Sequence, residues 1–264
     1  MAAALPGRPV AALDELPGRW PTDLFVVGDF HRWLGPVVWG DADALLFAVR
    51  AGSERHALVG VGEPAALAAV LDDAVASGLR RPDGTTVLDA GGPVSASLTR
   101  GAWDRSSDDV RRRLALPGAT HWDWLVADVP PPYVDGEQDV RELDPDVEAD
   151  DIRRLHDAAL PSTFFPVDRE GARWFGSRGD DGELRAVAGA AGWDHTVQLG
   201  GIATAPGCRG RGLGSAVTAA AARAGTTATG RASLALYADN AVAYRVYRRL
   251  GFRLHQPVET RRPA

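Results

Sequence analysis

Residues 205–218, APGCRGRGLGSAVT, place four glycines and two arginines between an apolar run typical of a strand (196–204) and an alanine-rich run typical of a helix (214–225). Glycine lets the backbone turn tightly and removes side chains that would hold a ligand away. The amides of residues 210–215 can then point at phosphate oxygens, and the helix adds its positive end. Arg209 and Arg211 add charge-assisted hydrogen bonds. The stretch therefore predicts a diphosphate site.

Three kinds of glycine-rich loop are compatible with such a site, and their spacing separates them. A dinucleotide-binding loop has the pattern G-x-G-x-x-G, with an acidic residue about 20 positions later. Here Gly210, Gly212 and Gly214 alternate, and residues 232–235 carry no charge, which disfavours a nucleotide-binding oxidoreductase. A P-loop needs lysine, and the chain has none. The pattern Arg-x-x-Gly-x-Gly fits from Arg209 onward, although an ordinary glycine-rich turn before a helix stays an alternative for the loop taken alone.

A second motif, DNAVAYRVYRRLGF at residues 239–252, lies on and after a predicted helix. With the first motif, it makes the sequence resemble the GNAT superfamily of acyl-CoA-dependent N-acyltransferases. The pattern of that superfamily is a strand ending in I-x-T-x-P, the Arg-x-x-Gly-x-Gly loop and, further on, N-x-x-A-x-x-x-Y-x-x-x-G-F. The resemblance covers residues 140–262, and residues 200–217 are most similar to the glycine N-acyltransferase-like branch. Members of that branch pair a degenerate first domain with a catalytic second domain.

The resemblance implies an α/β (α+β) class and the GNAT fold, a mixed central sheet flanked by helices, with a smaller GNAT-like domain before the catalytic one. It implies acetyl-CoA as co-substrate and no metal. In the family, the strand before the loop separates from its neighbour, the pantetheine arm adds like an extra strand, and a backbone N–H stabilises the oxyanion. The residues so implied to bind the co-substrate are Ile202, Ala203, Thr204, Arg209, Gly210, Arg211, Gly212, Leu213, Gly214, Ser215 and Asn240.

Tyr247 stands where the family carries the acid that protonates the departing thiolate. A phenol suits this task because it can share its proton with sulfur without leaving a permanent charge nearby. The alternative is that Tyr247 is only a buried helix aromatic. Tyr244, one turn earlier, could line the same cleft, and Asn240 could contact the co-substrate or only cap the helix.

The general base is where the sequence departs from the family pattern, because Gln198 stands where related members carry a glutamate. Glutamine cannot accept a proton usefully. His195 has a suitable reference pKa, but strand alternation places it on the face opposite to Gln198, and a surface histidine at a turn is the alternative. A water-mediated route, or an acceptor amine of low pKa, would need no side-chain base.

Three further side chains have weaker functional interpretations. Cys208 is next to the predicted phosphate loop, far from the thioester end, and we interpret it as an incidental thiol. Phe164 and Phe165 follow the first helix of the second half, in a region that forms the acceptor pocket in many family members. They could line that pocket or pack in the core.

Composition excludes several classes of function. The net charge of -6 argues against a nucleic-acid binder, although ten arginines and only two acidic residues follow Gly201. With no lysine, Schiff-base chemistry is excluded. The single cysteine excludes an intrachain disulfide, and the scattered histidines show no metal-ligand spacing. No apolar run is long enough for a signal peptide or a membrane span, so we expect a cytoplasmic protein without a membrane partner.

Proline residues at 130–132 predict a linker over residues 130–137, between domains at 1–129 and 138–264. The first domain is predicted to contain strands at 44–52, 56–62, 85–92 and 121–129, and helices at 63–78 and 105–116. The second is predicted to contain strands at 139–145, 172–179, 184–194, 196–204, 232–239 and 252–262, and helices at 144–160, 214–225 and 240–251. Residues 56–71 repeat the order strand, proline, helix without the glycine-arginine loop, so we expect this domain to bind no coenzyme A.

These observations predict an N-acetyltransferase that moves an acetyl group from acetyl-CoA to a primary amine through a tetrahedral intermediate. The acceptor would be a small molecule or a protein amine, and the protein a monomer or homodimer. The alternative is a non-catalytic acyl-CoA sensor, which the absence of a clear base would favour.

Overall fold

The computed structural model describes residues 5–51, 55–80, 84–86, 92–192 and 195–264, and the chain divides into two compact units. Unit 1 contains Met1–Asp123, Tyr237–Asp239 and Gln256–Ala264, and unit 2 contains Trp124–Leu236 and Asn240–His255. Each is described by itself. The boundaries expected at residues 129 and 138 stay a prediction, because compactness does not test which segments fold as domains. The strand expected at 85–92 lies mostly outside the described residues.

The strands of unit 1 follow the order β1-β2-β3-β4-β5-β12. Neighbours pair antiparallel, except that β4 and β5 are parallel. The core is formed by Leu46, Leu58, Leu67 and Leu98 with other apolar side chains. The elements are β1 (Leu5–Pro9), α1 (Leu24–Phe30), β2 (Val37–Gly40), β3 (Ala44–Arg50), β4 (His56–Gly62), α2 (Pro64–Ala76), β5 (Ala96–Thr99), α3 (Ala102–Arg105), α4 (Asp108–Leu114), β6 (Gly118–Ala127), which continues into unit 2, and β12 (Arg253–Arg262), which begins there.

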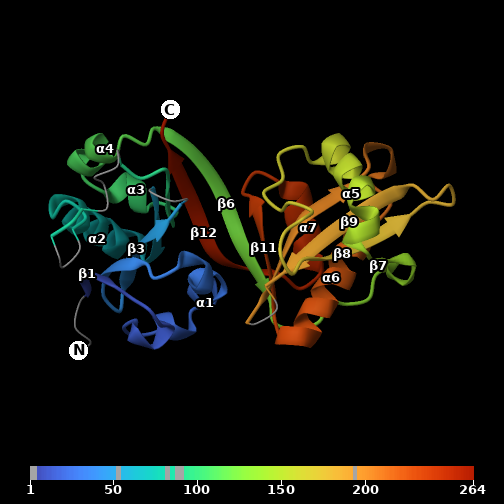
Figure 1. The fold of residues 1–264 in the computed structure, drawn as a ribbon, viewed down its shortest axis with the longest axis horizontal. Coiled ribbons are helices and arrows are strands. Elements are labelled where there is room, and N and C mark those ends of the chain that lie inside the picture. Colours follow the sequence, from blue (N-terminus) through green and yellow to red (C-terminus); the bar gives the residue numbers. More distant parts are fainter. Residues whose placement is uncertain (1–4, 52–54, 81–83, 87–91, 193–194) are drawn as a thin grey trace. The chain divides into compact units, whose positions relative to one another are not determined.

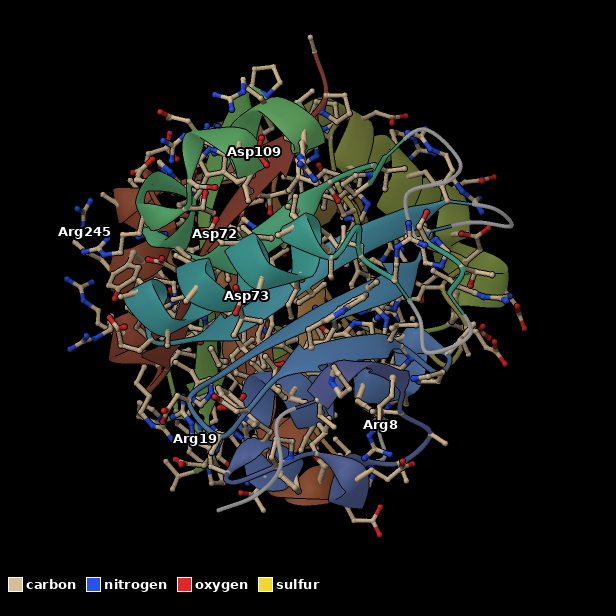
Figure 2. All side chains as sticks on the ribbon, turned by 90° about the vertical axis from the view of Figure 1, so that its left-hand side faces the viewer. Arg8, Arg19, Asp72, Asp73, Asp109 and Arg245 are labelled. Atoms are coloured by element: carbon tan, nitrogen blue, oxygen red, sulfur yellow. The ribbon has the colours of Figure 1, made fainter. Side chains whose placement is uncertain are left out.

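The helix expected at residues 105–116 is present as α4 but begins only at Asp108, because Ser106 is extended and separates α3 from α4. Ser107 caps α4 by accepting a hydrogen bond from the Val110 amide at 3.3 Å. Its own amide donates to Asp72 Oδ1 at 2.9 Å, which ties α4 to α2. Figure 2 shows Asp72 and Asp73 on α2, whose apolar positions pack into the core. Short polar side chains that compete for backbone amides thus break the helical run.

The strands of unit 2 follow the order β6-β11-β10-β9-β8-β7 (Figure 1). β10 pairs parallel with β11, while the β10–β9, β9–β8 and β8–β7 pairs are antiparallel. The sheet is therefore mixed, as expected. Its elements are β7 (Arg141–Leu143), α5 (Pro145–Ala159), β8 (Arg173–Arg178), β9 (Leu184–Ala191), β10 (Val197–Thr204), α6 (Leu213–Thr229), β11 (Ala232–Tyr237) and α7 (Ala241–Arg249).

Helices cover both faces of the sheet in unit 2. Trp174 of β8 and Val187 of β9 share a core cluster with Ile152 of α5. The next residue on each of these strands shares a second cluster with α6 and α7. Because successive side chains of a strand point to opposite faces, α5 lies on one face and α6 and α7 on the other. The expected flanked sheet is confirmed.

Helix α5 is fixed at its start by a buried carboxylate. Glu148 accepts hydrogen bonds from Arg178 Nη2 at 2.7 Å, from the Asp144 amide at 2.9 Å and from Arg141. Burial by itself raises the pKa of Glu148, but the bonds from Arg141 and Arg178 outweigh it and hold the pKa below its ordinary value of 4.5.

We expect Glu148→Gln to destabilise the protein by about 2 kcal/mol at pH 7, since charge-assisted bonds to a buried group are lost. A folded-state pKa below the unfolded value means that the stabilisation is present above pH 4.5 and is lost as the pH falls below it. The difference in unfolding free energy between wild type and variant, measured in urea from pH 7 to pH 3.5, should therefore shrink with acidity. A difference independent of pH would contradict this assignment.

Candidate functional site

The loop before α6 presents bare backbone to open space. Gly210 and Gly212 have φ of +78° and +83°, a region that glycine occupies without strain. A Cβ added at Gly207, Gly210 or Gly212 would meet no atom within 4 Å. Gly212 is the N-cap of α6, and no side chain caps that end. The first-turn amides of this 17-residue helix thus have no side-chain partner, and their contact with a diphosphate stays a prediction.

Two arginines lie between the glycines of this loop, and no acidic residue lies in the first turn of α6. Arg209 and Arg211 are both exposed, and Arg209 Nη2 donates to the carbonyl of Ala159, at the end of α5, at 3.4 Å. On the inner side of the loop, a Cβ at Gly214 would lie 3.0 Å from Thr204 Oγ1, so glycine there lets α6 approach the end of β10. The structure thus combines two cations, bare amides and a helix N-terminus at one place.

β10 parts from β11 after three residue pairs. The parallel pairing joins Val197–Leu199 to Ala232–Leu234 and does not continue beyond them in the described part of the chain. On its other side, β10 pairs Gly200 with Gly189 and then Ala203 with Val187, so a β-bulge lies at Gly201 and Ile202. Gly201 has a φ of +58°. A bulge bends its strand, and the resemblance implied that β10 separates here from its neighbour.

Tyr247 of α7 lies in the core cluster that also contains Leu199 of β10 and Leu236 of β11. Its ring packs edge-on against Phe252, with 6.1 Å between centroids. Burial raises the pKa of Tyr247 to about 12, so the phenol keeps its proton at neutral pH and can donate a hydrogen bond. Tyr244 is half-buried against the same cluster. The acid role of Tyr247 stays a prediction.

Asn240 caps α7, because its Oδ1 accepts a hydrogen bond from the Ala243 amide at 3.0 Å. A contact between Asn240 and the co-substrate stays a prediction.

The candidate base positions are placed as follows. His195 lies at an exposed turn. Gln198 is half-buried, and its Oε1 accepts a hydrogen bond from Arg169 Nη2 at 3.1 Å. The Arg169 guanidinium lies 4.6 Å from the centre of the Phe165 ring. Gln198 is thus bound by a cation from the loop after α5, and sequence reasoning did not find that contact.

The remaining candidate side chains, Phe164, Phe165 and Cys208, differ in burial. Phe165 is buried and packs edge-on against Trp174, with 5.5 Å between ring centroids, whereas Phe164 is 81% exposed. Cys208 is buried at the loop. His156 was also missed: it lies buried on α5, with Nε2 2.8 Å from the carbonyl oxygen of Gly201. Its position four residues after Ile152 on an amphipathic helix was a signal for burial but not for this contact.

Neither a metal centre nor a membrane span is found in the described part of the chain. Within residues 5–51, 55–80, 84–86, 92–192 and 195–264, no group of three or more histidine, cysteine, aspartate or glutamate side chains could hold a metal ion. Among the same residues, each helix is too short or too polar to cross a membrane.

Unit 2 therefore contains an α/β domain in which an uncapped helix N-terminus lies directly after a strand that parts from its parallel neighbour. Residues 136–252 match the model of the Acetyltransferase (GNAT) family. The members of that family are described as acetyltransferases.

Solved structures share the fold. A GCN5-related N-acetyltransferase from Kribbella flavida is 17% identical, with a TM-score of 0.51 over 91% of this chain and 95% of its own. One from Sphaerobacter thermophilus is 14% identical, with a TM-score of 0.52 over 87% and 81%. A protein from Novosphingobium aromaticivorans assigned to the GNAT family is 20% identical, with a TM-score of 0.51 over 80% and 88%. These similarities show the GNAT fold alone. No curated protein matches the sequence.

Proposed function

We propose that the protein is an N-acetyltransferase of the glycine N-acyltransferase-like branch, which transfers the acetyl group of acetyl-CoA to a primary amine. The observation that carries the proposal is the bare, cationic loop at the start of α6, next to the opening between β10 and β11. The acceptor is a small-molecule or protein amine, and we propose a monomeric or homodimeric protein that binds neither nucleic acid nor membranes.

Binding and chemistry follow from the two parts of this site. The amides of residues 210–215, with Arg209 and Arg211, hold the diphosphate, and Ile202, Ala203 and Thr204 of β10 hold the pantetheine arm. The neutral amine attacks the thioester carbon, a C–N bond forms, and the oxyanion is stabilised by a backbone N–H of the bulge. The C–S bond then breaks, and Tyr247 donates its hydrogen bond to the departing sulfur.

The proton of the attacking amine leaves through water in this proposal. Gln198 cannot serve as base, since its amide accepts from Arg169 and has no useful basicity. His195, at an exposed turn, is not held toward the opening by any contact in the described structure. A water-mediated route requires only that some of the acceptor amine be neutral at the working pH.

Unit 1 is a degenerate copy that binds no coenzyme A. Its elements β4, α2 and β5 repeat the parallel arrangement of β10, α6 and β11. At the start of α2, however, the carboxylate of Glu63 accepts hydrogen bonds from the amides of Ala65 and Ala66 at 2.8 and 3.1 Å. The first amides of α2, which could otherwise bind a phosphate, are therefore already hydrogen-bonded to a carboxylate of the chain.

A non-catalytic acyl-CoA sensor is the second candidate. It is favoured by Gln198, which replaces a basic group and is bound by Arg169. A sensor needs the co-substrate site but neither an acid nor a base.

Calorimetric titration with acetyl-CoA, followed by an amine screen, tests the proposal. We expect one molecule per chain, and saturation at 100 times the dissociation constant should stabilise the protein by about 2.7 kcal/mol. Free coenzyme A should appear with at least one class of primary amine. Binding without turnover on any amine would favour the sensor, and two molecules per chain would contradict the role given to Glu63. The absence of binding would overturn both candidates.

A further inference from the structure

A buried histidine contacts the bulge of β10 from the helix that covers it. His156 of α5 is 4% exposed, and its Nε2 lies 2.8 Å from the carbonyl oxygen of Gly201. Its ring packs against Trp174, with 5.5 Å between centroids, and Trp174 in turn contacts Phe165. The imidazole is thus held on two sides, by the indole and by the hydrogen bond.

The chemistry of this contact fixes the state of the ring. A carbonyl oxygen only accepts hydrogen bonds, so Nε2 must carry the proton and Nδ1 the lone pair when the ring is neutral. Burial lowers the pKa of His156 below its ordinary value of 6.5, and the bond to Gly201 and the charge of Asp157 oppose this only in part. The neutral Nε2–H form is therefore the one present at neutral pH.

The bulge needs such a contact because two residues of β10, Gly201 and Ile202, lie opposite one residue of β9. A regular ladder would pair each residue of β10 with one residue of β9, which shifts the register after Gly200 by one residue. Such a shift turns every following side chain to the other face of the sheet and every following amide to the other edge of the strand. Packing also fits the bulge closely: a Cβ on Gly201 would lie 2.8 Å from Trp174 and 3.1 Å from His156 Cε1.

We propose that His156 is a positioning residue, which holds the bulge of β10 through the Gly201 carbonyl and thereby sets the direction of the Ile202 N–H toward the thioester carbonyl. This inference rests on the proposed function in one respect, which is that the ligand facing the Ile202 N–H is an acyl thioester. His156 touches neither the co-substrate nor the acceptor in this role, since it acts from α5 on the backbone of β10.

Two variants test the role. His156→Leu keeps an apolar side chain of moderate size but removes the donor, whereas His156→Gln keeps an N–H at the distance of Nε2. For His156→Leu we expect kcat to fall roughly 30-fold, below the roughly 100-fold cost of a 1 Å misplacement. Its dissociation constant for free coenzyme A should stay within about threefold of wild type, because the loop before α6 is unaltered. His156→Gln should recover most of kcat.

Spectroscopy adds readouts that do not depend on turnover. In ¹⁵N-labelled wild type, long-range ¹H–¹⁵N spectra should show His156 protonated at Nε2 and bare at Nδ1. The Ile202 amide shift should respond to acetyl-CoA but much less to coenzyme A, and His156→Leu should abolish that difference. If the His156 ring of wild type is protonated only at Nδ1, the proposal is overturned, and this result does not require His156→Leu to fold. If His156→Leu folds and its Ile202 amide still distinguishes acetyl-CoA from coenzyme A as in wild type, the proposal is overturned as well.

The outcomes separate this proposal from the assigned activity. If wild type binds coenzyme A but acetylates no amine, the proposed activity is wrong. The two spectroscopic results would still decide the role of His156. If wild type acetylates an amine and His156→Leu keeps the full kcat, only the positioning role of His156 is wrong.

Discussion

Replacing Tyr247 by phenylalanine is expected to lower kcat by about 100-fold or more while leaving the dissociation constant of acetyl-CoA unchanged. The ring of Tyr247 is buried among Leu199, Leu236 and Phe252, and phenylalanine fills the same space. Only the hydroxyl is lost. Because the pKa of this phenol is raised to about 12, it is protonated throughout the neutral range, and its loss removes a hydrogen-bond donor and not a charge.

The measurement is steady-state kinetics at saturating acetyl-CoA, with calorimetry for binding. Tyr244→Phe is the matched control, since Tyr244 lies one turn earlier on α7 and is half-buried against the same cluster. We expect its kcat within about threefold of wild type, the effect of a small change in packing. Equal kcat values for wild type and Tyr247→Phe would show that the tyrosine is only part of the core.

Gly212→Asp is expected to weaken coenzyme A binding by about 100-fold or more, since charge repulsion and loss of donors act in the same direction. Gly212 is the N-cap of α6, its backbone has a positive φ, and the space beside it is open. An aspartate there would place a carboxylate where the diphosphate is proposed to bind. It would itself accept hydrogen bonds from the first amides of the helix.

Gly230→Asp controls for backbone strain in the Gly212 experiment. Gly230 is the C-cap of the same helix, with a φ of +74° and no atom within 4 Å of an added Cβ. Both substitutions carry a strain cost of about 1 kcal/mol in unfolding free energy, because both force a side chain into the left-handed region. In Gly212→Asp, the capping hydrogen bonds offset part of that cost. Only Gly212→Asp should lose coenzyme A affinity in calorimetric titration. Comparable losses in both variants would mean that the start of α6 is not the phosphate site.

Much of unit 2 could be predicted from sequence because its signals are local. Helix α5 was expected at 144–160 and runs over Pro145–Ala159, with the side chain of Asp144 capping it. The glycines of the loop at 207–214 indicate backbone freedom by residue type alone, and two of them have positive φ. Helix ends, caps and glycine loops depend on a few neighbouring residues, so the order of residues along the chain is enough to predict them.

The contacts that complete the site were decided only by tertiary structure. His156 reaches Gly201 across 45 positions of the chain, and Arg169 reaches Gln198 across 29. The bulge that displaces Ile202 depends on the register between β9 and β10, which the alternation of side chains in one strand does not reveal. By itself, the sequence determined the glycine-arginine loop and the helices of unit 2. Only folding decided the bulge and its histidine, because register and side-chain partners are set by packing between segments distant in the chain.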